Sequence, residues 1–387
     1  MSVGTDTGDR PDVVTDLKAD VTPGWTSGWA VPMQRPSIGF EPNWSEEGFS
    51  GHRLRQVVRL TAGGTAVRVR LSNRYGASPL VVDEVTVGAV RPVTFGGAGR
   101  VVIPAGGEVT ADRADLAVEA LGSLTVTMRL PETTGPATAH LQAYATSYRT
   151  RGDGFEETSH SWYYLAGVDV LADDPGPEAV AVFGDSITDG FGSTVDADDR
   201  LTDRVAERLA ASGRPRPVLN AGIGGNLILS DSAWFGEKAL DRFDRDVLDL
   251  PRVGAVILFG GLNDFGFSEI DLPTYKPNPQ RTADELIAAY RELIARARGR
   301  GLTVVGATML PMKGAEYYTE RSAAKIRAFN AWVRASGEFD AVADFHRAVA
   351  DPSDPERLDP AYDSGDHKHP NPSGYLRMAE AVDLDTL

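Results

Sequence analysis

The chain has 387 residues, which favours two domains over a single core, and its hydrophobic fraction of 42% is enough to bury both. It contains no cysteine, and this excludes disulfides, thiolate catalysis and cysteine-ligated metal sites. A net charge of -16 repels nucleic acid phosphates and anionic lipid surfaces, so we expect a neutral or cationic substrate and no nucleic acid partner.

The chain begins with a polar, acidic stretch. Residues 1–24 are rich in Asp, Thr and Gly without periodicity, which predicts a disordered or loosely docked leader. Met1 to Asp20 lacks the apolar core of a signal peptide, and no apolar run reaches the length of a membrane span. We therefore expect a soluble protein that is either cytoplasmic or a secreted mature form whose leader has been removed.

The pattern over residues 25–172 predicts an all-β domain. Alternating apolar residues on both sides of Gly63-Gly64 predict a β-hairpin. Because no convincing helical stretch occurs before residue 165, we expect an antiparallel β-sandwich of jelly-roll type as an accessory domain. Trp25 and Trp29 are expected to pack within it rather than to form a sugar-stacking platform. Further strands are predicted at 80–90, 100–103, 124–130 and 140–148.

Residues 173–177 predict a linker, after which strands and helices alternate. The clearest helix starts at Thr282, whose spacing from Glu285 matches a capping box. The alternation predicts an α/β domain over residues 178–387, with a parallel sheet covered by helices on both faces. The predicted strands are 179–183, 217–220, 254–259, 302–309 and 341–345, and the predicted helices are 201–209, 233–250, 282–299 and 326–333.

Gly184-Asp185-Ser186 directly follows the first strand of this α/β domain. The turn leaves Ser186 at the carboxyl end of a buried parallel strand, the edge at which open α/β sheets bind ligands. A serine hydroxyl is a weak nucleophile until a base takes its proton and donors stabilise the charge on the attacked carbonyl. In a hydrolase, the other loops at the same edge would have to supply those groups.

Two loops after the following strands carry candidate donors. The first contains Gly224 and Gly225, which let the backbone approach a ligand and present its amides. A dinucleotide site is disfavoured there, because Leu227 stands where the third glycine of GxGxxG belongs. In the second loop the Asn263 amide can donate to an oxyanion without carrying charge. In isolation, an Asn-Asp turn bonded to its own backbone is an equally good interpretation.

A candidate base lies near the C-terminus. Asp366 precedes His369 by three residues in a non-helical turn, and this spacing lets the carboxylate orient the imidazole. Of the six histidines, three lie in the β domain, and His346 is assigned a structural role because it follows the last strand. The spacing does not exclude His367 as the base, but His369 fits the predicted turn better. Asn371 is predicted to cap the terminal helix.

Together these motifs resemble the SGNH, or GDSL-type, hydrolase superfamily. The four blocks occur in the expected order within residues 178–387, and four in order are highly specific where one alone is weak. They are Gly184-Asp-Ser-Ile-Thr, Gly225, Gly261-x-Asn263-Asp and Asp366-x-x-His369-Pro. The β domain resembles the N-terminal domains of some carbohydrate-active esterases of this superfamily, which is a much weaker match.

The resemblance implies a flavodoxin-like three-layer fold and ester hydrolysis through an acyl-enzyme. It implies that Ser186 is the nucleophile, His369 the base and later the acid, and Asp366 the residue that orients the histidine. The backbone amides of Ser186 and Gly225 would form the oxyanion hole with the side chain of Asn263. This chemistry needs no cofactor and no metal.

The leading hypothesis is a serine carboxylester hydrolase acting on a small-molecule or carbohydrate ester with a short acyl group, acetylated sugars being one candidate. A thioesterase or acyltransferase with the same triad is an alternative, because all three share the acyl-enzyme. An α/β-hydrolase is disfavoured, since Thr188 replaces the second glycine of Gly-x-Ser-x-Gly. A carbohydrate-binding protein with a silent hydrolase fold is a further alternative, which the complete motif set disfavours.

Several aromatic residues near predicted strand ends could line an acyl or sugar pocket, although ordinary packing is at least as good an interpretation. They are Trp234, Phe235, Phe265, Phe267, Tyr317 and Tyr318. The segment 272–279 could form a flap or only a connection.

Overall fold

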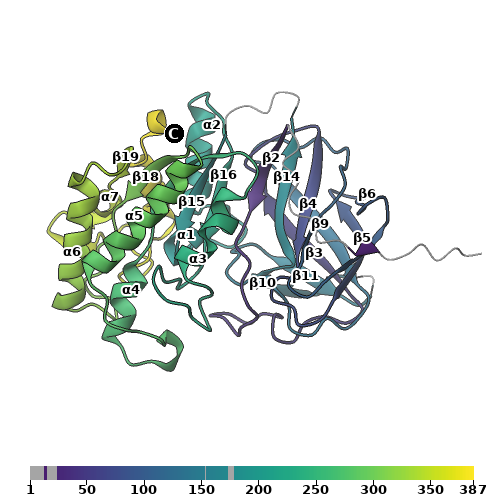
Figure 1. Ribbon diagram of the computed structural model, residues 1–387, viewed down its shortest axis with the longest axis horizontal. Coiled ribbons are helices and arrows are strands. Elements are labelled where there is room, and N and C mark those ends of the chain that lie inside the picture. The colour runs from purple at the N-terminus through teal and green to yellow at the C-terminus, as the bar shows by residue number, and fades with distance from the viewer. Residues whose placement is uncertain (1–12, 15–23, 153, 173–177) are drawn as a thin grey trace, which may run out of the picture.

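The computed structural model describes residues 13–14, 24–152, 154–172 and 178–387. Two halves lie side by side in Figure 1, a β half up to residue 172 and an α/β half from residue 178. The predicted linker lies outside the described residues. So does the predicted leader, apart from residues 13–14 and 24.

The α/β half is built on a five-stranded parallel sheet. Its strand order is β16-β15-β17-β18-β19, which is the flavodoxin-like order 2-1-3-4-5 when the strands are numbered along the chain. The order reverses at β15, so the loops after β15 and β17 flank the point where such sheets bind ligands. The strands are β15 (Ala179–Gly184), β16 (Val218–Gly222), β17 (Val253–Phe259), β18 (Thr303–Ala307) and β19 (Ala341–Ala343).

Two groups of helices cover this sheet. In one group α2 and α7 pack against α8, and in the other α5 packs against α3 and α6. Right-handed crossovers to the two sides of β15 put the groups on opposite faces, as the alternating sequence predicts. The helices are α1 (Ser186–Asp189), α2 (Leu201–Ala211), α3 (Ala239–Phe243), α4 (Leu262–Gly266), α5 (Ala283–Gly299), α6 (Glu320–Ala335), α7 (Phe345–Val349) and α8 (Pro372–Glu380). Short helical turns are η1 (Asp244–Leu248), η2 (Phe267–Glu269), η3 (Pro273–Tyr275) and η4 (Leu384–Thr386), and β20 (Ala350–Asp351) pairs with β21 (Asp354–Leu358).

The β half contains two main sheets that share one hydrophobic core. All their strand pairs are antiparallel except β1 with β7. Trp29 is buried and its ring meets that of Trp162 edge to face at 4.8 Å, so it packs inside this half. The larger sheet has the order β1-β7-β5-β9-β3-β11-β12, with β6 beside β5, and the smaller has the order β2-β14-β4-β8. The jelly-roll connection of these strands stays a prediction.

The strands of the β half match most of the predicted ones. They are β1 (Val13–Val14), β2 (Trp25–Ala30), β3 (His52–Arg59), β4 (Ala66–Ser72), β5 (Leu80–Val87), β6 (Arg91–Pro92), β7 (Arg100–Ile103), β8 (Glu108–Thr110), β9 (Ser123–Leu130), β10 (Ala139–His140), β11 (Ser147–Thr150), β12 (Glu157–Ser159), β13 (Trp162–Tyr163) and β14 (Leu165–Leu171). The predicted strand 140–148 is wrong, because β10 and β11 are separate and belong to different sheets.

The predicted hairpin around Gly63-Gly64 is also wrong. Strand β3 pairs with β9 and β11 in the larger sheet, whereas β4 pairs with β14 and β8 in the smaller one. The segment between them crosses from one sheet to the other and bonds to neighbours on both sides. The Leu60 N–H donates to Gly122 O at 2.8 Å, and the Thr65 N–H donates to Leu171 O at 2.8 Å.

Strand β2 and Thr61, which follows β3, are among the parts of the β half that contact the α/β half. Ala30 of β2 shares a small apolar cluster with Ala179 and Leu219 of the α/β sheet. Thr61 Oγ1 donates to Val218 O and accepts from the Val218 N–H, both at 3.0 Å. Because these contacts are buried, the halves are held together by both apolar packing and hydrogen bonds.

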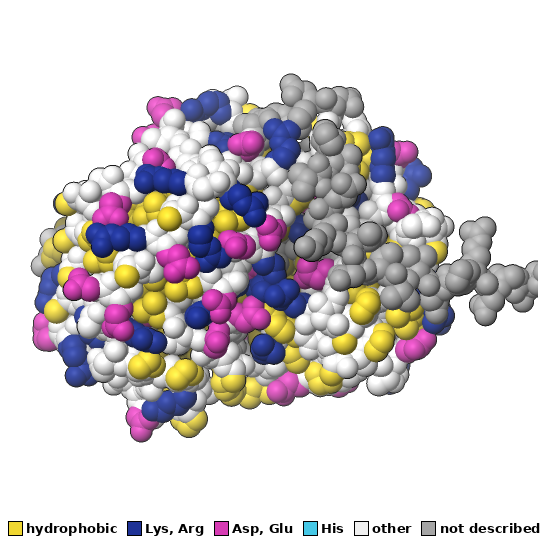
Figure 2. Space-filling view, viewed as in Figure 1, with side chains coloured by type: hydrophobic (Ala, Val, Ile, Leu, Met, Phe, Trp, Pro, Cys, Tyr) yellow, Lys and Arg dark blue, Asp and Glu magenta, His cyan; other side chains and the backbone are white. Residues whose placement is uncertain are grey.

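The surface in Figure 2 carries acidic and basic side chains interspersed on the face shown, rather than gathered by sign. Across the described ranges, none of the helices combines the length and the apolar character needed to cross a bilayer.

Candidate active site

Ser186 lies at the carboxyl end of β15, where the chain turns directly into the short helix α1. The Asp185 side chain accepts from the Ile187 N–H at 3.2 Å and so caps this turn. Gly184 must be a glycine, because a Cβ there would lie 1.9 Å from Phe259 O. The sequence Gly-Asp-Ser therefore fixes a tight turn in which Ser186 is only 8% exposed.

His369 meets Ser186 across 183 positions of sequence. Ser186 Oγ lies 2.8 Å from His369 Nε2, and His369 Nδ1 lies 2.5 Å from Asp366 Oδ2. Since an ionised carboxylate only accepts, Nδ1 carries the proton toward Asp366, and the Nε2 lone pair faces the serine hydroxyl. The three side chains thus form one directed hydrogen-bonded chain.

The turn that holds Asp366 is fixed by its own backbone. Asp366 Oδ1 accepts from the N–H groups of Lys368 at 3.1 Å and His369 at 2.9 Å. Helix α8 begins directly after this turn, and the Asn371 side chain accepts from the Gly374 N–H, which confirms the predicted cap. These bonds leave the Asp366 carboxylate little freedom to turn away from the imidazole.

The electrostatics of the pair favour an ionised Asp366 and a neutral His369. Burial raises the pKa of Asp366, but the hydrogen bond and charge of His369 outweigh it and hold that pKa well below its usual value. Burial lowers the pKa of His369 below 6.5, and the Asp366 carboxylate only partly restores it. At neutral pH the imidazole is therefore free to accept a proton.

The other two candidate histidines lie elsewhere. His367 has a left-handed φ of 65° and bonds through Nδ1 to Asp363 Oδ2 at 2.6 Å, on an exposed side of the loop. His346 belongs to α7, where its N–H donates to Thr308 Oγ1. Neither ring is the one that reaches Ser186 Oγ.

The loop after β16 forms a tight turn beside the serine. The Asn226 N–H donates to Ile223 O at 3.1 Å, and Gly225 has a φ of 71° at the third position of the turn. A Cβ on Gly225 would lie 2.4 Å from Phe235 Cδ1, so the ring packs directly on this turn. We call residues 223–226 the oxyanion turn, after the role that we propose for Gly225.

Within the oxyanion turn, the two adjacent glycines differ in what their amides do. The Gly224 N–H donates to Asp189 Oδ2 at 2.8 Å and is therefore occupied. Among the described residues, no acceptor takes the Gly225 N–H. This difference favours Gly225 as the donor that remains available to a ligand.

Asn263 lies in the first turn of α4, next to the oxyanion turn. Its Nδ2 donates to Asn226 O at 3.1 Å, and because an amide nitrogen has two N–H groups, one remains for a ligand. The neighbouring Asp264 accepts from the N–H groups of Ile228 at 2.9 Å and Leu229 at 3.0 Å. Burial raises the pKa of Asp264 to about 6.

A buried arginine joins these loops, and the sequence patterns gave no sign of it. Arg242 is fully buried and donates to Gly184 O at 2.7 Å, Ala221 O at 2.9 Å and Asn226 Oδ1 at 2.9 Å. It also pairs with Asp246 at 3.1 Å, which neutralises its charge. Its guanidinium therefore ties the ends of β15 and β16 to the oxyanion turn.

Aromatic rings surround the site. Phe191 packs on the His369 ring at a centroid distance of 4.1 Å. Phe235 meets Phe267 at 5.3 Å, and Phe267 stacks on Tyr275 at 4.0 Å. Phe40, which comes from the β half and is 56% exposed, stacks on Phe235 at 5.5 Å.

The other aromatic candidates have ordinary roles. Phe265 is fully buried in the core, and Trp234 packs against that core. Tyr317 meets Phe267 edge to face at 6.1 Å, and Tyr318 donates to Glu356 at 2.9 Å. In the described parts of the chain, no group of three or more acidic or histidine side chains is arranged to hold a metal ion.

The sequence matches the model of the GDSL-like Lipase/Acylhydrolase family over residues 182–377. Among curated proteins, no sequence matches this chain.

Three solved structures similar to this chain each cover about half of it. A variant of an acetyl xylan esterase from Geobacillus stearothermophilus is 23% identical, covers 53% of this chain and 93% of its own, and gives a TM-score of 0.42. A GDSL-like lipase from Bacteroides thetaiotaomicron is 19% identical, with coverages of 54% and 87% and a TM-score of 0.40. A lipase/acylhydrolase from Enterococcus faecalis is 21% identical, with coverages of 53% and 92% and a TM-score of 0.40.

Proposed function

The chain belongs to the GDSL-like lipase/acylhydrolase family, and from this premise we propose that it is a serine carboxylester hydrolase that cleaves short-chain acyl esters. The observation that carries the proposal is the hydrogen-bonded chain from Ser186 Oγ through His369 to Asp366. A nucleophile, a base and a group that orients the base are the parts that acyl transfer to serine requires.

The reaction proceeds in two halves. His369 Nε2 takes the proton of Ser186 Oγ as that oxygen attacks the ester carbonyl, and then gives the proton to the departing alcohol. Water attacks the resulting acyl-enzyme with His369 again as base, which releases the acid and restores the serine. Asp366 accepts the hydrogen bond of the His369 Nδ1–H, which keeps the imidazole in its orientation, and its charge stabilises the imidazolium that forms in each half of the reaction.

The negative charge on the attacked carbonyl oxygen is stabilised by three donors. They are the backbone N–H groups of Ser186 and Gly225 and the free N–H of the Asn263 side chain. Two observations support this choice. The Gly224 N–H already donates to Asp189, which leaves Gly225 as the available amide, and the Asn263 side chain uses only one of its two N–H groups to bond Asn226. Because the site is buried, each such hydrogen bond is worth more than it would be in water.

A short acyl group suits the crowding around the serine. Ser186 is 8% exposed, Phe191 packs on the ring of its partner His369, and Phe235 packs on Gly225. We propose acetyl groups, including those on carbohydrates, as the acyl class. We also propose that residues 25–172 are an accessory domain of a catalytic domain that spans residues 178–387.

A panel of p-nitrophenyl esters from acetate to octanoate tests the function. We expect the highest kcat/KM for acetate or butyrate and no turnover by Ser186→Ala. A thioester and an alcohol acceptor, assayed in parallel, distinguish hydrolysis of esters from thioesterase or transferase activity. Absence of turnover of every ester, together with no labelling of Ser186 by a fluorophosphonate, would show that the site is catalytically silent.

Asn263→Ala tests the oxyanion donors separately. Removing one donor costs about 10²- to 10³-fold in kcat, so this variant should be slow but measurable. Circular dichroism of the same sample controls for folding, because Asn263 also bonds to Asn226. A variant that hydrolyses p-nitrophenyl acetate as fast as the parent would remove Asn263 from the oxyanion hole.

A further inference from the structure

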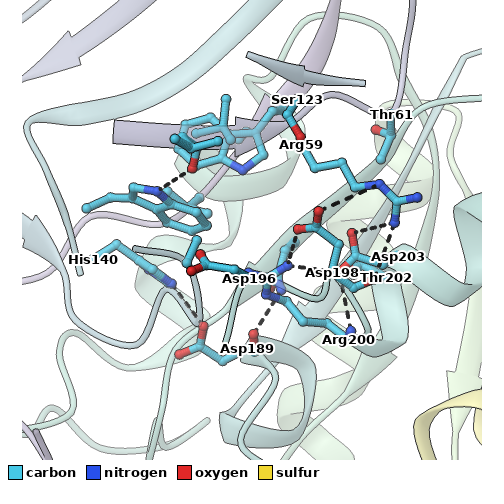
Figure 3. A pocket seen from close by; sticks show the side chains of 18 of the residues that line it. Arg59, Thr61, Ser123, His140, Asp189, Asp196, Asp198, Arg200, Thr202 and Asp203 are labelled. Atoms are coloured by element: carbon cyan, nitrogen blue, oxygen red, sulfur yellow. Dashed lines mark hydrogen bonds and ion pairs between the residues drawn. The ribbon is translucent and has the colours of Figure 1, made fainter. Parts of the chain in front are cut away.

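We propose that His140 of the β half is a positioning residue for the oxyanion turn, acting through Asp189. The inference rests on the proposed function, since it assigns the geometry of that same site partly to the other half of the molecule. Figure 3 shows the His140 and Asp189 side chains pointing toward one another in the wall of a cavity of about 200 Å³ between the halves.

Asp189 links three parts of the molecule. It is the last residue of α1, the short helix that begins at Ser186. Its Oδ1 lies 2.9 Å from His140 Nε2, and its Oδ2 accepts the Gly224 N–H at 2.8 Å. His140 and Asp189 are each 1% exposed, so both bonds are shielded from bulk solvent.

The second ring nitrogen of His140 defines its protonation. Nδ1 lies 2.9 Å from Pro32 O, and because a carbonyl only accepts, Nδ1 carries a proton. Nε2 faces Asp189 Oδ1, so one proton between these two groups completes the hydrogen bond. Without His140, the Asp189 side chain would keep only its bond to the Gly224 N–H among the described residues.

A second residue of the β half fixes the same glycine. A Cβ on Gly224 would meet Gln142 Oε1 at 1.5 Å, so the Gln142 side chain occupies the space beside this peptide. Trp162 stacks on the His140 ring at a centroid distance of 5.6 Å, which fixes the plane of the imidazole. The β half therefore lies directly against the Cα of Gly224 through Gln142, and it reaches the Gly224 amide indirectly, through the bond of His140 to Asp189.

Small displacements at this position affect the chemistry. One peptide group joins Gly224 to Gly225 and carries the Gly225 N–H. A rotation of the backbone at Gly224 therefore moves that N–H. An oxyanion donor works at 2.7 to 3.1 Å from the developing charge, and a shift of about 1 Å can cost about 10²-fold in rate. Loss of His140 should thus weaken transition-state binding more than substrate binding.

The test compares three full-length variants with the parent. His140→Ala breaks the link, and His140→Gln keeps an N–H that can reach Asp189. Thr61→Val is the matched control, because Thr61 also joins the two halves by buried hydrogen bonds but reaches Val218 at the start of β16, away from Gly224. For each we would measure kcat and KM for p-nitrophenyl acetate, inhibition by ethylboronic acid and the melting temperature.

We expect His140→Ala to lower kcat about 10- to 100-fold with KM within about twofold, and to weaken ethylboronic acid binding in proportion. His140→Gln should recover most of both losses. Thr61→Val should melt at a lower temperature with kcat within about twofold of the parent. If His140→Ala changes only the melting temperature, or changes only KM, the positioning role is wrong.

Gln142→Ala decides the question if His140→Ala does not fold, because Gln142 is only half-buried and its removal frees the same peptide. A fall in its kcat at unchanged KM supports the inference, and a kcat equal to that of the parent overturns it. A parent enzyme without esterase activity would instead contradict the proposed function, so the two failures are distinguishable.

Discussion

Two features of the surroundings of His369 shift its pKa in opposite directions. Burial lowers the pKa, and the Asp366 carboxylate raises it without restoring the ordinary value. Since the proposed base His369 must be neutral to accept a proton, activity should fall as the pH drops through its pKa, which places the acid limb of kcat/KM below pH 6.5.

Asp366→Asn should change both the rate and this pH profile. The amide can bond to Nδ1 in the wrong tautomer, so we expect a loss of up to about 10⁴-fold in kcat. Removal of the carboxylate also removes the influence that raises the His369 pKa, so the acid limb should move to lower pH. The measurement is kcat/KM from pH 4 to 9, and a limb that moves upward would contradict the assigned pairing.

At the residue scale, sequence reasoning worked where the signal was local. Asp366 and His369 are three residues apart in one turn, and their spacing alone suggested the bond that the structure contains. Arg242 had no such signal, because its partners are backbone carbonyls of Gly184 and Ala221 on separate strands. His140 was set aside with the β half, since nothing in the sequence indicated that this half reaches the catalytic edge.

At the scale of elements, helix α5 has the capping box that its sequence predicts. Thr282 Oγ1 accepts from the Glu285 N–H at 3.2 Å, and the Thr282 N–H donates to Glu285 Oε2 at 2.8 Å. Thr282→Ala should therefore lower the free energy of unfolding by about 1 kcal/mol, measured by urea denaturation, and leave kcat unchanged. Glu285→Gln, which preserves the box, is the control and should cost less. Equal stability of Thr282→Ala and the parent would show that the cap contributes nothing.

Strand pairing was harder to predict than strand position. Alternation located β3 and β4, but the Gly63-Gly64 step between them looked like a hairpin turn and is a crossing between sheets. Periodicity reports which face of a strand is buried and not which strand lies beside it.

The predicted helix 233–250 is shorter in the structure than in the prediction. It begins at Ala239 and continues as a π-helical turn to Leu248. Residues 231–238 instead form the loop that carries Phe235 to Gly225.

At the scale of the whole molecule, the buried contacts between the halves should make them unfold together. Arg59 of the β half donates to Glu207 at 3.0 Å and also pairs with Asp203, and both partners lie on α2. We expect one calorimetric transition for the full chain, with Arg59→Ala lowering its midpoint. Arg291→Ala removes an exposed ion pair with Glu338 inside one half and should change the midpoint little. Two well-separated transitions in the parent would mean that the halves unfold independently.

The position of β14 in the smaller sheet has a consequence for how the protein is made. β14 lies between β2 and β4, yet it is the last strand of the β half to leave the ribosome. The smaller sheet therefore cannot be completed until residue 171 has emerged. Any expression boundary placed before that residue would leave two unpaired strand edges open to aggregation.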